Sequence, residues 1–152
     1  MTAGLLRSLV CATLAGAALA CSGMAHALHY RSVAAPSILY DSPSTQGKPL
    51  HIINAGTPVE SVVAIEGWNK VRDIQGALAW IEKKQLSDKR MVQVRVDRAA
   101  VLAQANDKAT LVFEAERDVV LELLESTGTG WVQVRHRDGQ TGYVKTLQVW
   151  GL

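Results

Sequence analysis

Residues 67–72 read Gly-Trp-Asn-Lys-Val-Arg, and residues 130–135 read Gly-Trp-Val-Gln-Val-Arg, so one pattern returns after 63 positions. Further matches surround the two hexapeptides and keep the same order along the chain. They are Gly76 with Gly139, Trp80 with Tyr143, Leu39 with Leu102 and, after a two-residue gap, Val59 with Val120. Two copies of about 60 residues are too few and too long for a solenoid, so they predict two small globular domains in tandem.

Each copy alternates short runs rich in β-branched residues with glycine turns, which predicts strands. The expected strands span residues 59–65, 68–73 and 78–81 in the first copy, and 92–96, 119–125, 131–137 and 141–144 in the second. Asp138-Gly139 predicts a type I′ turn, in which both central residues have positive φ. Short helical turns fit residues 83–87 and 145–148. This all-β pattern of short strands favours small barrels.

The two copies meet at residues 87–91, a segment without proline or glycine. We expect domains at residues 28–90 and 91–152. A domain of about 60 residues buries only about 60% of its unfolded surface and is marginally stable alone. We therefore expect the two domains to pack together.

The first 27 residues have the features of a cleavable signal peptide. Arg7 is the only charge in the first 25 residues, and the apolar run 9–20 is too short to span a bilayer comfortably. Ala25-His26-Ala27 is a small-x-small cleavage pattern. The alternatives are an uncleaved N-terminal anchor, or a lipoprotein anchored through Cys21, which follows Ala18-Leu19-Ala20.

Composition and cysteine content exclude several classes. Both cysteines, Cys11 and Cys21, lie in the predicted signal peptide, so the cleaved chain has no disulfide, thiol nucleophile or cysteine metal site. Removing Arg7 leaves 15 basic against 14 acidic residues, a net charge of +1 that does not suggest a nucleic-acid partner. No later apolar run is long enough for a membrane span. We expect a periplasmic or secreted protein.

Alternation along the strands suggests where the tryptophans point. Trp68 shares a face with Arg72, and Trp131 shares a face with Arg135, while Val71 and Val134 lie on the opposite, core-facing side. An exposed aromatic ring beside a guanidinium suits the recognition of sugars or peptides. The alternative is that each tryptophan caps its own barrel or the joint between the two.

Other aromatic residues have structural interpretations. Trp80 and Tyr143 occupy equivalent strand positions, and we expect them to pack in the cores. Trp150 is expected to pin the end of the chain against a barrel.

No constellation of catalytic or metal-binding residues emerges. The spacing of His29, His51 and His136 matches no metal-ligand pattern, and no serine lies in a nucleophile elbow. We therefore expect no metal, no cofactor and no enzymatic activity.

The order and duplication of these motifs resemble the bacterial SH3 domain (SH3b, SH3-like) family. The first copy has the Leu-x-x-x-Pro-Ser segment at residues 39–44, Gly-Trp-x-x-Val-Arg at 67–72 and an aromatic closing motif at 79–81. The second copy repeats the last two motifs at residues 130–135 and 142–144. It departs from the family at residues 103–107, where the Pro-Ser segment is missing, and the first copy has Ala79 where the family has glycine.

This resemblance implies two tandem SH3-like β-barrels that bind without catalysis in the bacterial cell envelope. It implies binding at the cell wall or to envelope proteins, and our leading hypothesis for the partner is peptidoglycan or its stem peptides. The candidate ligand-binding residues are Trp68, Arg72, Trp131, Arg135 and, as part of an aromatic ridge like that of SH3 domains, Tyr40. The alternative is a scaffold or adaptor that binds another envelope protein, for example by strand addition.

Overall fold

The computed structural model describes residues 29–152. The signal peptide predicted at residues 1–27, with Cys11 and Cys21, lies outside the described residues and stays a prediction. The elements found in residues 29–152 are strands and 3-10 turns. No helix in this part of the chain is long and apolar enough to cross a membrane.

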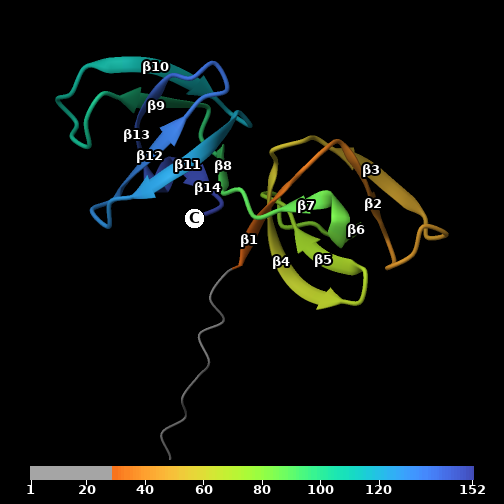
Figure 1. Ribbon diagram of the computed structural model, residues 1–152. Helices are drawn as coiled ribbons and strands as arrows, with labels where there is room; N and C mark the ends of the chain where they lie inside the picture. Colours follow the sequence, from red (N-terminus) through yellow and green to blue (C-terminus); the bar gives the residue numbers. More distant parts are fainter. Residues whose placement is uncertain (1–28) are drawn as a thin grey trace, which may run out of the picture.

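Seven antiparallel strands form the first domain (Figure 1). Their bounds, with the 3-10 turn η1, are β1 (Tyr30–Val33), β2 (Ser37–Tyr40), β3 (Pro49–Ile53), β4 (Pro58–Ile65), β5 (Trp68–Arg72), β6 (Leu78–Glu82), η1 (Lys83–Gln85) and β7 (Leu86–Ser87). Hydrogen bonds join the strands in the order β3-β2-β6-β5-β4-β1-β7.

The second domain repeats this topology strand for strand. Its elements are β8 (Met91–Val94), β9 (Arg98–Leu102), β10 (Leu111–Glu116), β11 (Val120–Ser126), β12 (Trp131–Arg135), β13 (Thr141–Lys145), η2 (Thr146–Gln148) and β14 (Val149–Trp150). The order β10-β9-β13-β12-β11-β8-β14 is that of the first sheet. The expectation of two tandem all-β domains is confirmed, whereas the boundaries 28–90 and 91–152 stay a prediction.

Each domain has its own apolar core, built by alternation along the strands. In β5 and β12 the inward residues Val71 and Val134 are buried, as expected. The first core consists of Val33, Leu39, Ile53, Val59, Val71, Ala79, Ile81 and Leu86. The second consists of Val92, Val94, Ala99, Val101, Ala115, Leu121, Val132, Val134, Val144 and Val149.

Strand register corrects two of the predicted matches between the copies. Tyr40 pairs with Trp80 in the first sheet and Leu102 pairs with Tyr143 in the second, so the counterpart of Leu39 is the buried Val101 rather than Leu102. Glu60 pairs with Arg72 and Glu122 pairs with Arg135, so the counterpart of Val59 is Leu121 rather than Val120. The predicted matches were wrong by one residue because the second copy has one residue more between Glu122 and Trp131 than the first copy has between Glu60 and Trp68.

The turn at Asp138-Gly139 is also not of the predicted type. Among residues 29–152, Asp118 is the non-glycine residue with positive φ, so Asp138 does not have the left-handed conformation that a type I′ turn requires. Gly139 N–H donates to the His136 carbonyl at 2.9 Å, and His136 N–H donates to the Gln140 carbonyl at 2.8 Å. With φ of 95° at Gly139, this is a type I turn closed by a glycine bulge.

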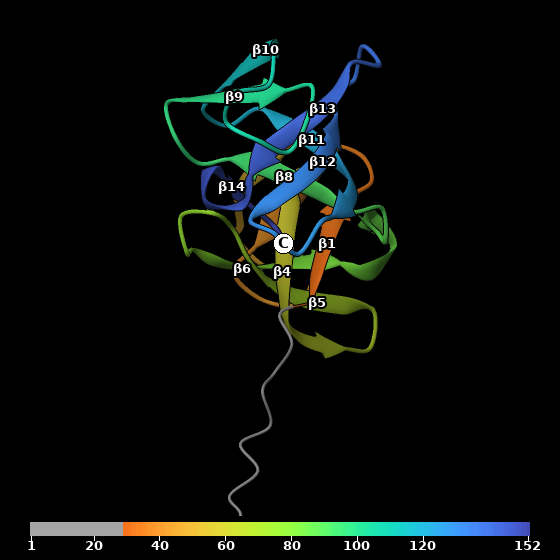
Figure 2. The same cartoon turned by 90° about the vertical axis from the view of Figure 1, so that its left-hand side faces the viewer.

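The two domains pack together at a joint formed by β1 and β4 on one side and β8 and β14 on the other, as Figures 1 and 2 show from two directions. The ring of Tyr30 contacts the indole of Trp150, with centroids 5.0 Å apart. Arg90 Nη2 donates to the Gly151 carbonyl at 2.9 Å. A Cβ on Gly151 would lie 3.1 Å from Cβ of Pro58, so the C-terminal end is packed closely against the first domain.

Candidate functional site

Three aromatic side chains gather on the outer face of the first domain, and we call Tyr40, Trp68 and Trp80 the aromatic surface. Tyr40 and Trp80 are paired across β2 and β6, so their side chains share a face. The rings of Tyr40 and Trp68 meet edge to face, with centroids 5.6 Å apart and planes at 86°. All three side chains are half-buried. Such a surface offers flat apolar faces with polar edges, which suits stacking against a sugar ring or a peptide.

A lysine and two aliphatic residues extend the aromatic surface. Lys70 pairs with Trp80 across β5 and β6, and its Nζ lies 5.8 Å from the centroid of that ring. On β4, Val63 faces Lys70 and Ile65 faces Trp68. Their exposed fractions are 44% and 40%, so apolar area continues from the aromatic rings along the β4–β5 hairpin.

The second domain has a more polar version of this face. Trp131 lies on β12, but the Nζ of Lys145 lies 5.5 Å from its ring centroid, and Asp107 in turn holds that ammonium group at 2.5 Å. Leu102 stands in place of Tyr40, and Glu125, opposite Gln133, stands in place of Val63. The two domains therefore share a fold but present different chemistry at the corresponding face.

The two candidate arginines are held by carboxylates of their own domains. Arg72 Nη1 donates to Glu60 at 3.0 Å, and Arg135 donates to Glu122 through Nε and Nη2, both at 3.1 Å. Lys89 from the segment between the domains also reaches Glu122, at 3.3 Å. Burial by itself raises the pKa of Glu122, but the hydrogen bonds from Arg135 and Lys89 outweigh it, and that pKa lies below its ordinary value.

The structure brings some of the predicted site residues together and separates others. Tyr40 and Trp68 are in direct contact, and Arg72 lies at the far end of the strand that begins with Trp68. Trp131 and Arg135 share a strand of the other domain. The five candidates therefore form two separate surfaces, one on each domain.

The expectation that Trp80 and Tyr143 pack in the cores was wrong. On β6 and β13 the buried residues are Ala79, Ile81, Gly142 and Val144, and the aromatic residues between them face outward and are half-buried. Side chains alternate along a strand, so the buried neighbours of Trp80 and Tyr143 fix their outward direction.

A histidine lies beside a further cavity of about 400 Å³ in the second domain. His136 packs against Phe113, with ring centroids 5.6 Å apart, and its Nδ1 lies 3.0 Å from Asp138. Hydrogen bonds from the Gln140 backbone and side chain, followed by His136, lower the pKa of Asp138 to about 2. Within residues 29–152, no three His, Cys, Asp or Glu side chains gather in a group that could hold a metal ion.

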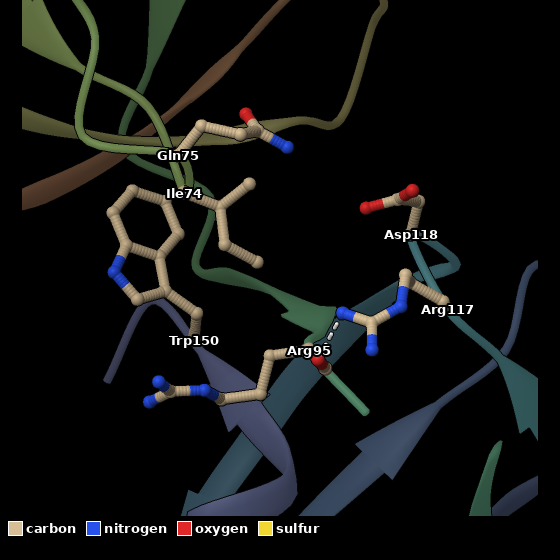
Figure 3. A pocket seen from close by; sticks show the side chains of 6 residues that line it. All are labelled: Ile74, Gln75, Arg95, Arg117, Asp118 and Trp150. Atoms are coloured by element: carbon tan, nitrogen blue, oxygen red, sulfur yellow. Dashed lines mark hydrogen bonds between the residues drawn. The ribbon is translucent and has the colours of Figure 1, made fainter. Parts of the chain in front are cut away.

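A pocket of about 250 Å³ opens at the joint between the domains (Figure 3). Its lining residues come from both domains and are Ile74, Gln75, Arg95, Arg117, Asp118 and Trp150. This pocket was not predicted from the sequence, and of its lining residues only Trp150 was expected to have a role, as a packing residue. No repeat or motif marks the others, because the pocket exists only where one copy meets the other.

Comparison with known proteins gives one family match and several structural similarities. The sequence model of the family described as bacterial SH3 domain matches twice, at residues 33–88 and 95–151. No curated protein matches the sequence.

The structural similarities are to longer chains of low identity. NlpC2 and NlpC1 of Trichomonas vaginalis match with 14% and 16% identity, each with a TM-score of 0.37, over 82% and 84% of this chain and 48% and 47% of theirs. An NlpC/P60 family protein from Bacillus cereus matches with 15% identity and a TM-score of 0.38, over 80% of this chain and 56% of its own. This chain thus spans about half the length of the solved structures it matches.

Proposed function

Since this chain belongs to the bacterial SH3 domain family, we propose that it is a non-catalytic binding module of the bacterial cell envelope that recognises peptidoglycan or its stem peptides. The observation that carries the proposal is the aromatic surface of Tyr40, Trp68 and Trp80. In exported bacterial proteins, domains of this family are commonly non-catalytic binding modules. The predicted signal peptide at residues 1–27 supports a periplasmic or secreted location.

The chemistry of the aromatic surface supports a ligand with both apolar faces and polar groups. The rings of Tyr40 and Trp68 supply stacking area, and the ammonium group of Lys70 beside Trp80 supplies a cation for a carboxylate or a donor for a hydroxyl. Binding that depends on stacking loses little affinity at high salt, because salt screens charges and not apolar contacts.

Co-sedimentation with purified peptidoglycan sacculi tests the proposal. Trp68→Ala is expected to weaken binding about thirtyfold, since removing a central aromatic anchor costs about 2 kcal/mol. Trp131→Ala is expected to weaken it less, because Glu125 and the Lys145–Asp107 pair make that face polar. Leu147→Ala serves as the matched control, since it also truncates an apolar side chain and Leu147 is 84% exposed on η2.

The folding of each variant must be checked by circular dichroism and thermal melting. Folded Trp68→Ala protein that no longer sediments with sacculi supports the proposal. Absence of sedimentation by the unaltered protein contradicts it.

An exposed sheet edge favours a second candidate function, that of an adaptor for another envelope protein. Strand β3 ends the order of the first sheet, and its Ile52 is 67% exposed and pairs with Ile38, which is 42% exposed. An edge strand with exposed apolar side chains can accept a strand from a partner. Replacing Ile52 with lysine should then abolish cross-linking to a protein partner and leave sedimentation with sacculi unchanged.

A further inference from the structure

The pocket at the joint between the domains has features that the packing of the domains does not account for. Ile74 and Gln75 come from the turn between β5 and β6, Arg95 follows β8, Arg117 and Asp118 lie between β10 and β11, and Trp150 belongs to β14. Neither domain alone could form this pocket. Ligand sites occur preferentially at such domain interfaces.

Arg95 supplies a cation that no other residue of the described chain neutralises. Most arginines of residues 29–152 bond to a carboxylate or carbonyl group, namely Arg31, Arg72, Arg90, Arg98, Arg117 and Arg135. Within the same residues the exposed Arg95 guanidinium makes no hydrogen bond and no ion pair. Arg117, its neighbour in the pocket, already bonds to Asp97 at 2.8 Å and to the Arg95 carbonyl at 2.5 Å, as the dashed line in Figure 3 indicates.

The walls of the pocket are apolar on one side and polar on the other. In Figure 3 the indole of Trp150 stands beside Ile74, and Arg117 and Asp118 lie across from them. The edge-to-face contact with Tyr30 holds the indole in place. Asp118 accepts a hydrogen bond from the buried Gln93 through Oδ1 at 3.1 Å, which leaves Oδ2 for another donor.

We propose that this pocket binds the free carboxylate end of a short peptide, with Arg95 as the counter-ion and Trp150 and Ile74 as the surface for its small side chains. Asp118, which lies across the pocket from Trp150, accepts an N–H group farther along the peptide. A guanidinium matches a carboxylate in geometry as well as in charge. The inference rests on the proposed function, because a peptidoglycan stem peptide ends in such a carboxylate.

The arrangement argues against a polyanion as the ligand. A phosphate polymer needs several unpaired cations along its length, and here Arg95 stands alone with the carboxylate of Asp118 in the same pocket. One unpaired cation, one acceptor and an aromatic wall fit the end of a peptide better than a chain of phosphates.

Titration of the purified protein with N-acetyl-D-alanyl-D-alanine, followed by NMR, tests the inference. The indole N–H signals of the four tryptophans serve as reporters, and Trp150→Phe assigns the signal of interest. We expect the Trp150 signal to shift saturably while that of Trp68 stays in place. The C-terminal amide of the same dipeptide should bind at least about tenfold more weakly, as should Arg95→Gln with the free acid, because a charged hydrogen bond is lost.

Arg98→Gln is the matched control, since it removes the same charge from a β9 arginine that pairs with Glu114 outside the pocket. It should bind the dipeptide as the unaltered protein does. Equal binding of the acid and the amide, or unchanged binding by Arg95→Gln, would overturn the inference. Displacement of the dipeptide by inorganic phosphate at equal concentration would overturn it too, in favour of a general anion site.

Failure of this inference can be told apart from failure of the proposed function. If the protein sediments with sacculi and the dipeptide shifts no signal, the pocket is not the site and the aromatic surface remains the wall-binding surface. If the dipeptide binds through Arg95 and sacculi are not bound, the carboxylate chemistry of the pocket stands and its peptide comes from another source.

Discussion

The ring of Tyr30 lies edge-on against the indole of Trp150, with centroids 5.0 Å apart and planes at 81°. Tyr30 opens the first strand and Trp150 closes the last, so this contact joins the two ends of the described chain across the domain boundary. Burial raises the pKa of Tyr30, and the charge of Glu60 raises it further. Because the contact crosses the domain boundary, it holds the two domains together. It also fixes the position of Trp150, which forms one wall of the pocket at the joint.

Removing this contact should uncouple the two domains. A double-mutant cycle with Tyr30→Leu and Trp150→Leu should give a coupling energy of about 0.5–1.5 kcal/mol, the usual range for an edge-to-face pair beyond its buried area. Denaturant unfolding of the four proteins measures it. Strictly additive single effects would mean that the rings touch without stabilising the joint.

A charge at the centre of β12 should unfold the second domain. Val134 is fully buried, so Val134→Asp places an unpaired carboxylate in the core, at a cost of about 4 kcal/mol or more. The neighbouring Gln133→Asp introduces the same charge on the outer face and should leave the fold intact. Near-ultraviolet circular dichroism distinguishes the two, and a folded Val134→Asp protein would contradict the assignment of the core.

The equivalent positions Ala79 and Gly142 should respond in opposite ways to a methyl group. A Cβ on Gly142 would lie 2.8 Å from the Leu102 carbonyl oxygen and 2.6 Å from Val101 Cγ1, so Gly142→Ala should destabilise the second domain by about 1–3 kcal/mol. In the first domain Ala79 already fits, with 4% of its surface exposed. Ala79→Gly should cost about 0.5–1 kcal/mol through backbone entropy. Thermal melting of both variants checks the prediction, and a Gly142→Ala protein that melts at or above the temperature of the unaltered protein would contradict it.

Acid should weaken the ion pairs of Glu122. Because its pKa is lowered on folding, the carboxylate contributes stability that is fully present above the ordinary value of 4.5 and is lost as the pH falls through the lower folded-state pKa. Each partly exposed pair, with Arg135 and with Lys89, contributes about 0.2–1 kcal/mol. Melting temperature measured from pH 7 to pH 3 should fall more steeply for the unaltered protein than for Glu122→Gln. Parallel curves would exclude a contribution from Glu122.

Much of the fold follows from the repeated hexapeptide. Val71 and Val134 are buried and Trp68 and Trp131 face outward, because period-two alternation alone assigns the two faces of a strand. Alternation along the strands also predicts that Trp80 and Tyr143 face outward, because Ala79 and Gly142 precede them on the inward face. The expectation that they pack in the cores relied instead on the general preference of large aromatic residues for protein interiors.

The joint pocket could not be found in the sequence. Arg95 and Gln75 carry no motif, and their proximity depends on how two folded domains dock, which periodicity does not encode. The ion pairs of Arg72 and Arg135 also could not be predicted, because they depend on a register in which each arginine faces a glutamate. The alignment of the two copies was wrong by one residue on the strands that carry Glu60 and Glu122.

The contact of the first strand with the last also sets the order in which the molecule can form. All strands of the first domain precede residue 88, so the strand pairs within this domain need no residue of the second domain. Trp150 belongs to the strand that follows all the others among residues 29–152, and until it is in place Tyr30 lacks the aromatic partner of this contact. The contact between Tyr30 and Trp150 therefore cannot form before the last strand is in place, and a chain without residues 150–152 would lose both this contact and the hydrogen bond from Arg90 to the Gly151 carbonyl.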